Sequence, residues 1–138
     1  MSKTQHFRDQ HIEMLHLVKE ITNILNVDTL ARESLKAHKL LSSLFASLNL
    51  HLSMEDKIVY PLLLKSPDEK VRRLAKQFAT EMGSIGIVLK KYNTKWENHL
   101  DIQNKTKVFI EETKEIFDAL SKRIEKEDCE LYNAFDKI

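Results

Sequence analysis

Apolar residues recur at alternating spacings of three and four over four stretches of this chain, which is the period of an α-helix that buries one face. The four apolar stripes cover residues 7–25, 37–62, 71–96 and 109–134. The connections between them are short, and the 138 residues include only two glycines and two prolines. Short connections make successive helices antiparallel neighbours. The sequence therefore predicts an all-α fold, an up-down-up-down antiparallel four-helix bundle, in which residues 1–138 form a single domain.

The two prolines carry signals for helix ends. Pro61 lies near the end of the second stripe and should bend or stop that helix, because proline lacks a backbone donor. Ser66 and Glu69 flank Pro67 in the pattern of a capping box. Ser66 is therefore the predicted N-cap of the third helix.

Charge and composition exclude several classes of function. The 22 basic and 21 acidic residues nearly cancel, which argues against nucleic acid or an anionic membrane as a partner. No stretch approaches the ~20 apolar residues of a membrane-spanning helix, and the single cysteine, Cys129, cannot form an internal disulfide. The chain has neither a nucleophile paired with a base nor a glycine-rich phosphate loop. We therefore expect a soluble cytoplasmic protein, and no enzymatic activity is singled out.

Ionisable residues occupy positions on these stripes where an apolar residue is expected. They are His11 on the first stripe, His51 and Glu55 on the second, and Arg123 and Glu127 on the fourth. Buried polar groups are costly unless a partner satisfies them, so these positions are candidates for a functional site. At ~1.5 Å per residue, antiparallel helices would place them within roughly 12 Å of one another in height. The sequence therefore predicts one polar layer inside the bundle, which the third stripe meets at Met82.

Two arrangements would satisfy this layer. Imidazole and carboxylate groups are metal ligands, and His51 and Glu55 lie one helical turn apart, where they can bind the same ion. Alternatively, the guanidinium of Arg123 binds one or both of Glu55 and Glu127 and replaces the cation in a metal-free network. If Arg123 turned outward, the layer would be an ordinary hydrated end of the bundle. The residues alone leave these alternatives open.

Three segments resemble the hemerythrin-like HHE cation-binding domain family, and together they extend over nearly the whole chain. Residues 51–61 resemble its second-helix signature, His-x-x-x-Glu-[Glu/Asp] followed by an aromatic residue and proline. His11 matches the ligand of the first helix, and residues 123–132 resemble the fourth-helix signature, in which His-x-x-x-Glu precedes Leu-Tyr. The resemblance implies a hemerythrin-like bundle with a non-haem di-iron centre, which that family uses to bind or sense dioxygen, nitric oxide, peroxide or iron.

The chain departs from this pattern at two of the family's histidines. The third-helix histidine falls at Met82 and the fourth-helix histidine at Arg123. A thioether is a poor iron ligand, and a guanidinium has no free lone pair with which to coordinate a metal. The metal ligands that the resemblance leaves are His11, His51, Glu55 and Glu127, with Glu81 as a further candidate. This set can hold one ion, or two ions poorly.

The hypothesis from the sequence is a non-haem iron-binding domain with a depleted ligand set, holding one or two ions. Open coordination positions favour a sensor or binding protein for a small ligand: an oxidant, nitric oxide or dioxygen. The alternative is a metal-free interaction or regulatory module, in which Arg123 pairs with Glu55 and Glu127 and apolar residues beside the stripes support a homodimer. A mononuclear site of two histidines and a carboxylate can also activate oxygen, but no residue specifies a substrate.

Overall fold

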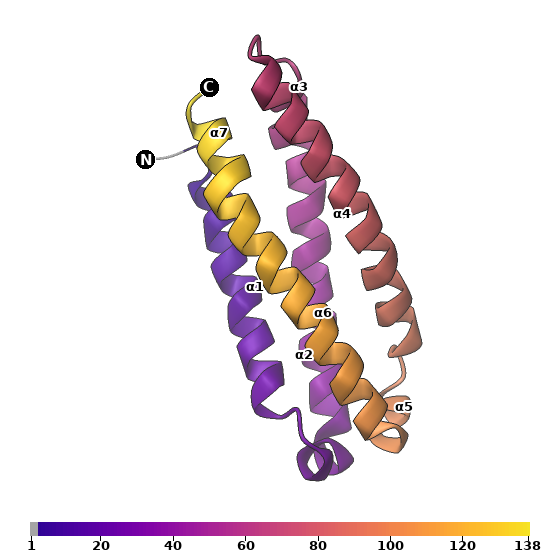
Figure 1. The fold of residues 1–138 in the computed structure, drawn as a ribbon. Coiled ribbons are helices and arrows are strands. Elements are labelled where there is room, and N and C mark those ends of the chain that lie inside the picture. The colour runs from indigo at the N-terminus through magenta and orange to yellow at the C-terminus, as the bar shows by residue number, and fades with distance from the viewer. Residues whose placement is uncertain (1–2) are drawn as a thin grey trace.

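The computed structural model describes residues 3–138, which form helices joined by short turns and contain no strand (Figure 1). The long helices are α1 (Gln5–Asn23), α2 (Val27–Met54), α4 (Glu69–Lys95) and α6 (Thr106–Lys126). The short helices are α3 (Tyr60–Leu64), α5 (His99–Asn104) and α7 (Tyr132–Asp136). Two π-helical turns, η1 (Glu55–Val59) and η2 (Glu127–Leu131), connect α2 to α3 and α6 to α7. The predicted all-α class is confirmed for the described residues.

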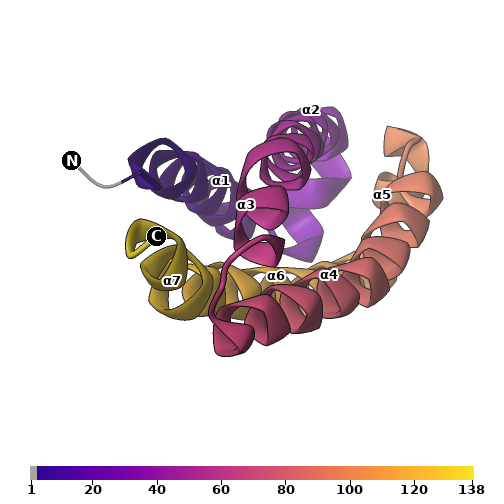
Figure 2. The same ribbon diagram turned by 90° about the horizontal axis from the view of Figure 1, so that it is seen from above.

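The long helices lie lengthwise beside one another (Figure 1). The two ends of the described chain lie at the end of the molecule that also carries α3, whereas α5 lies at the opposite end. Viewed along the helices, α1 and α2 occupy one side of the molecule and α6 and α4 the other (Figure 2). Side chains from α1, α2 and α6 can therefore meet in a common interior.

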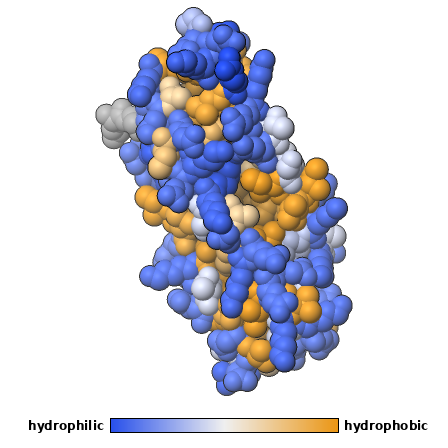
Figure 3. All heavy atoms as spheres, in the orientation of Figure 1, coloured by the Kyte–Doolittle hydropathy of each residue, from blue (hydrophilic) through white to orange (hydrophobic). Residues whose placement is uncertain are grey.

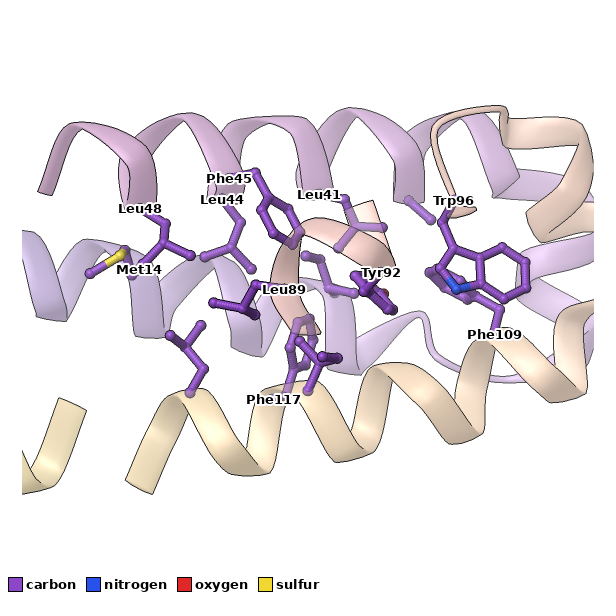
Figure 4. Packing of buried hydrophobic residues seen from close by; sticks show 14 of the residues in the cluster. Met14, Leu41, Leu44, Phe45, Leu48, Leu89, Tyr92, Trp96, Phe109 and Phe117 are labelled. Atoms are coloured by element: carbon purple, nitrogen blue, oxygen red, sulfur yellow. The ribbon is translucent and has the colours of Figure 1, made fainter. Parts of the chain in front are cut away.

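Two clusters of buried apolar side chains fill this interior. The larger cluster, drawn in Figure 4, includes Met14, Leu44, Leu48, Tyr92 and Phe117. The smaller cluster, near α3 and α7, includes Phe7, Leu63, Phe78, Leu131 and Tyr132. On α1, the buried His11 lies between Phe7 of the smaller cluster and Met14 of the larger one. A polar layer therefore separates the two clusters, and apolar packing on both sides keeps its groups away from water.

The two prolines lie near helix ends, but the predicted N-cap of the third helix is wrong. The helical run that starts with α2 ends at Leu64, three residues after Pro61, so Pro61 lies near the helix end as predicted. The predicted cap Ser66 is wrong by two residues. The N-cap of α4 is Asp68, whose carboxylate accepts a hydrogen bond from the N–H of Lys70 at 2.9 Å. Asp68 directly precedes the first helical residue, whereas the Ser66 hydroxyl accepts a hydrogen bond from the N–H of Asp68 at 3.2 Å.

The surface is mixed in character. Figure 3 shows hydrophobic residues in patches between hydrophilic ones on the face drawn there. The most exposed large apolar side chains are Ile12, Leu50, Ile87 and Val88. Among the described residues, every helix is too short or too polar to cross a membrane.

Candidate metal centre

Two π-helical turns orient the glutamates of the polar layer. At η1 the backbone N–H of Tyr60 donates to the carbonyl of Glu55, and at η2 the N–H of Tyr132 donates to the carbonyl of Glu127. In an α-helix a residue five positions on would point away from the first. The wider π-helical turn instead allows Glu55 and Tyr60, and likewise Glu127 and Tyr132, to be buried together. π-helical turns inside α-helices frequently mark functional sites.

His11 from α1, His51 from α2 and Glu127 from η2 form a buried cluster of candidate metal ligands. His11 Nε2 lies 3.0 Å from His51 Nε2 and 2.9 Å from Glu127 Oε1. His51 Nε2 lies 3.5 Å from the same glutamate oxygen. None of the three side chains is more than 3% exposed. Two imidazole nitrogens and a carboxylate oxygen therefore point at one place in the protein interior.

The Nδ1 atom of each imidazole faces away from the other ligands and makes a hydrogen bond that fixes the orientation of the ring. His11 Nδ1 lies 2.8 Å from Asp128 Oδ1, and His51 Nδ1 lies 2.6 Å from Gln10 Oε1. Because both partners are acceptors, each Nδ1 carries a proton, and Nε2 is the atom through which each ring can bind an ion in the interior. Metal-ligating histidines are held in this way. Asp128 and Gln10 lie off the apolar stripes, so neither was predicted from the sequence.

The hydroxyl group of Tyr132 completes the cluster. It donates a hydrogen bond to Glu55 Oε2 at 2.7 Å and lies 3.0 Å from His51 Nε2. Burial and the two glutamates Glu127 and Glu55 raise the pKa of Tyr132, so the residue is a neutral phenol in the metal-free protein. Tyr132 was not predicted as a site residue either. Its only signal is the Leu-Tyr pair of the fourth-helix signature, because α-helical periodicity would have turned it away from Glu127.

Arg123 points into the interior and is only 4% exposed, which excludes the hydrated arrangement with its side chain turned outward. Its Nε donates to Glu127 Oε2 at 2.8 Å. Its Nη2 donates to the Tyr60 hydroxyl and to the Phe78 carbonyl, both at 3.0 Å. The expected pairing of Arg123 with Glu127 is therefore present. The expected pairing with Glu55 is wrong: the ion pairs of the described residues include none between them, and Nη2 donates to Tyr60 and Phe78 instead.

Glu55 is fully buried and only half satisfied. Its Oε2 accepts the hydrogen bond from Tyr132 and lies 3.4 Å from His51 Nε2. Its Oε1 has no hydrogen-bond partner among the described residues. A buried carboxylate oxygen without a partner is costly, so this site has capacity for a further cation or proton donor.

The two third-helix candidates lie beside this cluster rather than in it. Glu81 is partly exposed, accepts hydrogen bonds from Lys126 Nζ at 2.9 and 3.3 Å, and lies 3.6 Å from Arg123 Nη1. The hydrogen bond from Lys126 is the main reason that the pKa of Glu81 is lowered. Met82 packs against the larger apolar cluster and lines a shallow groove between α2 and α4. Neither side chain belongs to the group formed by His11, His51 and Glu127.

The pKa shifts of the ionisable groups show that positive charge is stabilised in the polar layer. Burial raises the pKa of the Glu55 carboxyl. Burial disfavours charge on His51, but its hydrogen bonds with Glu127 and Glu55 outweigh that effect and raise the pKa of His51 to about 9. Burial also disfavours charge on Glu127, yet hydrogen bonds with His11 and His51 and the charge of Arg123 hold its pKa well below its usual range. In the metal-free protein, a proton on His51 therefore supplies charge that a cation would supply.

The donor atoms are spaced as neighbouring ligands of one ion. Two ligands bound at about 2.1 Å and at right angles to each other are about 3.0 Å apart. The separations of His11 Nε2 from His51 Nε2 and from Glu127 Oε1 are 3.0 and 2.9 Å. Without a cation, two imidazole lone pairs and two carboxylates converge with few protons between them. The residues that are present thus fit one metal ion.

Comparison with protein families agrees with this geometry. The family model described as hemerythrin HHE cation binding domain matches residues 2–135. Searches of curated proteins and of solved structures found no match. The family match covers nearly the whole chain, including every residue of the polar layer. The chain therefore belongs to the hemerythrin HHE cation-binding domain family.

Proposed function

We propose that this protein binds a single non-haem metal ion, with iron as the first candidate, through His11, His51, Glu55 and Glu127. Its role would be to bind or sense a small ligand such as nitric oxide, an oxidant or dioxygen. The observation that carries the proposal is the convergence of two imidazole Nε2 atoms and a carboxylate oxygen within hydrogen-bond distance in a buried layer. The unpartnered oxygen of Glu55 supports the same conclusion.

The contacts of Glu127 support one ion rather than two. Its Oε1 faces the histidines, whereas its Oε2 accepts the hydrogen bond from Arg123 at 2.8 Å. A bridging carboxylate in a di-metal site would offer one oxygen to each ion. Here the guanidinium occupies the second cation position, and it cannot be exchanged for a metal because it is covalently part of the chain.

The protein provides a route by which a small ligand can approach the layer. A groove between α2–η1 and α4 is lined by Leu52, Asp56, Tyr60, Ala79, Met82, Gly83 and Gly86. At both glycines the space where a Cβ would lie has no other atom within 4 Å, so this side of α4 is open. Tyr60, which lines the groove, accepts a hydrogen bond from Arg123 Nη2 in the polar layer. This side of the layer is therefore the proposed approach for dioxygen or nitric oxide.

The proposal extends to the architecture and the location of the protein. The arrangement of α1, α2, α4 and α6 supports the up-down-up-down four-helix bundle, with residues 1–138 as one domain. The free thiol of Cys129 supports a reducing compartment such as the cytoplasm.

A metal-free module is the second candidate, because protonated His51 and Arg123 together supply two positive charges to the layer. This arrangement leaves Glu55 Oε1 without a partner. The metal-bound form gives both glutamates a cation, and it is therefore the better account of the geometry.

Metal analysis tests the proposal directly. Purified protein is stripped of metal with a chelator, incubated anaerobically with excess Fe²⁺, desalted and analysed for iron. We expect one iron per chain in the wild type and two in the Arg123→His variant, because an imidazole can ligate the second ion. Nitric oxide added anaerobically should then produce a new absorption band only in iron-loaded protein. A wild-type chain that retains no iron would favour the metal-free module, and a wild-type chain with two would contradict the role given to Arg123.

The hydrogen bond between His11 and Asp128 should contribute to metal affinity. Replacing Asp128 by alanine frees the His11 ring to rotate and to change tautomer, and we expect Fe²⁺ binding to weaken about 10–100-fold. Competition with a chromophoric chelator measures the affinity. Asp118→Ala is the matched control, because Asp118 is exposed and forms an ion pair with Lys122 on the surface of α6. Equal affinities of the two variants would show that the Asp128 contact does not orient a ligand.

A further inference from the structure

The hydroxyl oxygen of Tyr132 lies within hydrogen-bond distance of every member of the proposed ligand set. It lies 2.7 Å from Glu55 Oε2, 3.0 Å from His51 Nε2, and 3.2 Å from both His11 Nε2 and Glu127 Oε1. We propose that the oxygen of Tyr132 is itself a ligand of the bound ion, coordinated as a phenolate. This inference rests on the proposed function, since it requires an ion in the site.

The distances fit a coordination position. Neighbouring ligands of one ion, bound at about 2.1 Å and at right angles, are about 3.0 Å apart. An oxygen that lies 2.7–3.2 Å from four other donor atoms is therefore placed as their common neighbour in one coordination sphere. All hydrogen bonds of this hydroxyl within the described residues are to those four groups. It is thus directed at the metal position and at no other part of the protein.

Packing fixes the ring of Tyr132 in this orientation. The residue is fully buried. The ring stacks on His11 with 5.2 Å between centroids and contacts Phe7 at 5.8 Å, and the guanidinium carbon of Arg8 lies 5.5 Å from its centroid. A side chain held on three sides needs little movement to become a ligand, so the entropic cost of coordination is small.

The charges of the site favour this coordination. Glu55 and Glu127 carry two negative charges, and the guanidinium of Arg123 offsets one of them. A phenolate at position 132 would therefore lower the net charge of a layer that holds a trivalent ion from +2 to +1. Coordination breaks the O–H bond of Tyr132 and forms an oxygen–metal bond with the electron pair left on the oxygen. The phenol proton goes to the buffer, as does the proton of His51 when its Nε2 becomes a ligand. A cation that is bound directly to an oxygen lowers the pKa of that group strongly.

The corresponding tyrosine of the other π-helical turn has a different partner. Tyr60 follows Glu55 just as Tyr132 follows Glu127, but its hydroxyl accepts a hydrogen bond from Arg123 Nη2 at 3.0 Å. The Tyr60 oxygen therefore contacts Arg123. The chain contains only three tyrosines, and the third, Tyr92, forms a hydrogen bond with Thr113 inside the larger apolar cluster. Removing the hydroxyl of each tyrosine in turn therefore identifies which tyrosine is the ligand.

Spectroscopy of the ferric protein tests the inference. Protein loaded with Fe²⁺ is oxidised with ferricyanide, which takes one electron per iron and becomes ferrocyanide, and is then desalted. A phenolate ligand gives an intense visible charge-transfer band, and Raman excitation within this band enhances phenolate ring vibrations. We expect both signals in the wild type and in Tyr60→Phe and Tyr92→Phe, and complete loss of both in Tyr132→Phe.

The outcomes separate this inference from the proposed function. If the wild type binds iron but shows neither signal, or if Tyr132→Phe retains them, Tyr132 is not a ligand while the metal site stands. Loss of the band in Tyr60→Phe instead of Tyr132→Phe would also overturn the inference. If Tyr132→Phe does not fold or hold iron, a Raman phenolate signal shared by the wild type, Tyr60→Phe and Tyr92→Phe still assigns the ligand by elimination. A wild type that takes up no iron overturns both proposals.

Discussion

Replacing Arg123 by methionine should lower the free energy of unfolding of the metal-free protein by about 3–5 kcal/mol, which is the cost of breaking a buried ion pair from one side. The substitution keeps most of the side-chain volume but removes the partner of Glu127 Oε2 and the donor to Tyr60 and Phe78. These groups are buried and have no access to water as a replacement. Urea denaturation at neutral pH, followed by circular dichroism, measures the change.

Lys122→Met provides the matched control for this prediction. Lys122 precedes Arg123, is 76% exposed and pairs with Asp118 on the surface of α6. Exposed ion pairs contribute little, so the control should change stability by less than about 1 kcal/mol. If Arg123→Met were as mild as the control, the histidines alone would satisfy Glu127, and the guanidinium would have no structural role in the layer.

Replacing His51 by alanine should weaken Fe²⁺ binding by more than about 100-fold, because loss of a ligand should exceed the 10–100-fold cost of losing a partner that only orients one. His51 Nε2 lies within 3.5 Å of His11 Nε2, Glu55 Oε2 and Glu127 Oε1. It is therefore the metal-ligand atom that contacts all the other proposed protein ligands. Iron content after anaerobic loading and desalting gives a first answer. Competition with a chelator then gives the affinity.

His16→Ala is the control for this substitution. His16 is on the same helix as His11, but its side chain is 68% exposed and lies beside Glu20 on the surface. It should leave iron content unchanged. Iron content that survives in His51→Ala but falls in His16→Ala would place the metal on the surface, and the buried layer would then have no metal-binding role.

The hydrophobic periodicity was sufficient to predict the four long helical stretches and the burial of the polar layer, but not the short helix α5 or the π-helical turns. Burial of one helix face requires apolar residues at alternating spacings of three and four, so a histidine or glutamate on such a stripe is a visible exception. His11, His51, Glu55, Arg123 and Glu127 are all buried, as their positions on the stripes indicated. The constant rise per residue of an α-helix gives the position of each residue along the bundle axis, so residues distant in the sequence could be assigned to one layer.

The partners of these residues were decided by the tertiary structure. Asp128 and Gln10 contact histidines of other helices from positions off the stripes, and the periodicity of a single helix contains no information about such contacts. The π-helical turns shift the following residues, so that Tyr132 and Tyr60 lie on the interior side against α-helical expectation. The sequence by itself therefore determined which ionisable groups on the stripes are buried, because burial follows local spacing. Only the three-dimensional packing decided that the second nitrogen of the Arg123 guanidinium binds Tyr60 and Phe78 and not Glu55, because hydrogen bonds form between whichever groups the neighbouring helices bring within reach.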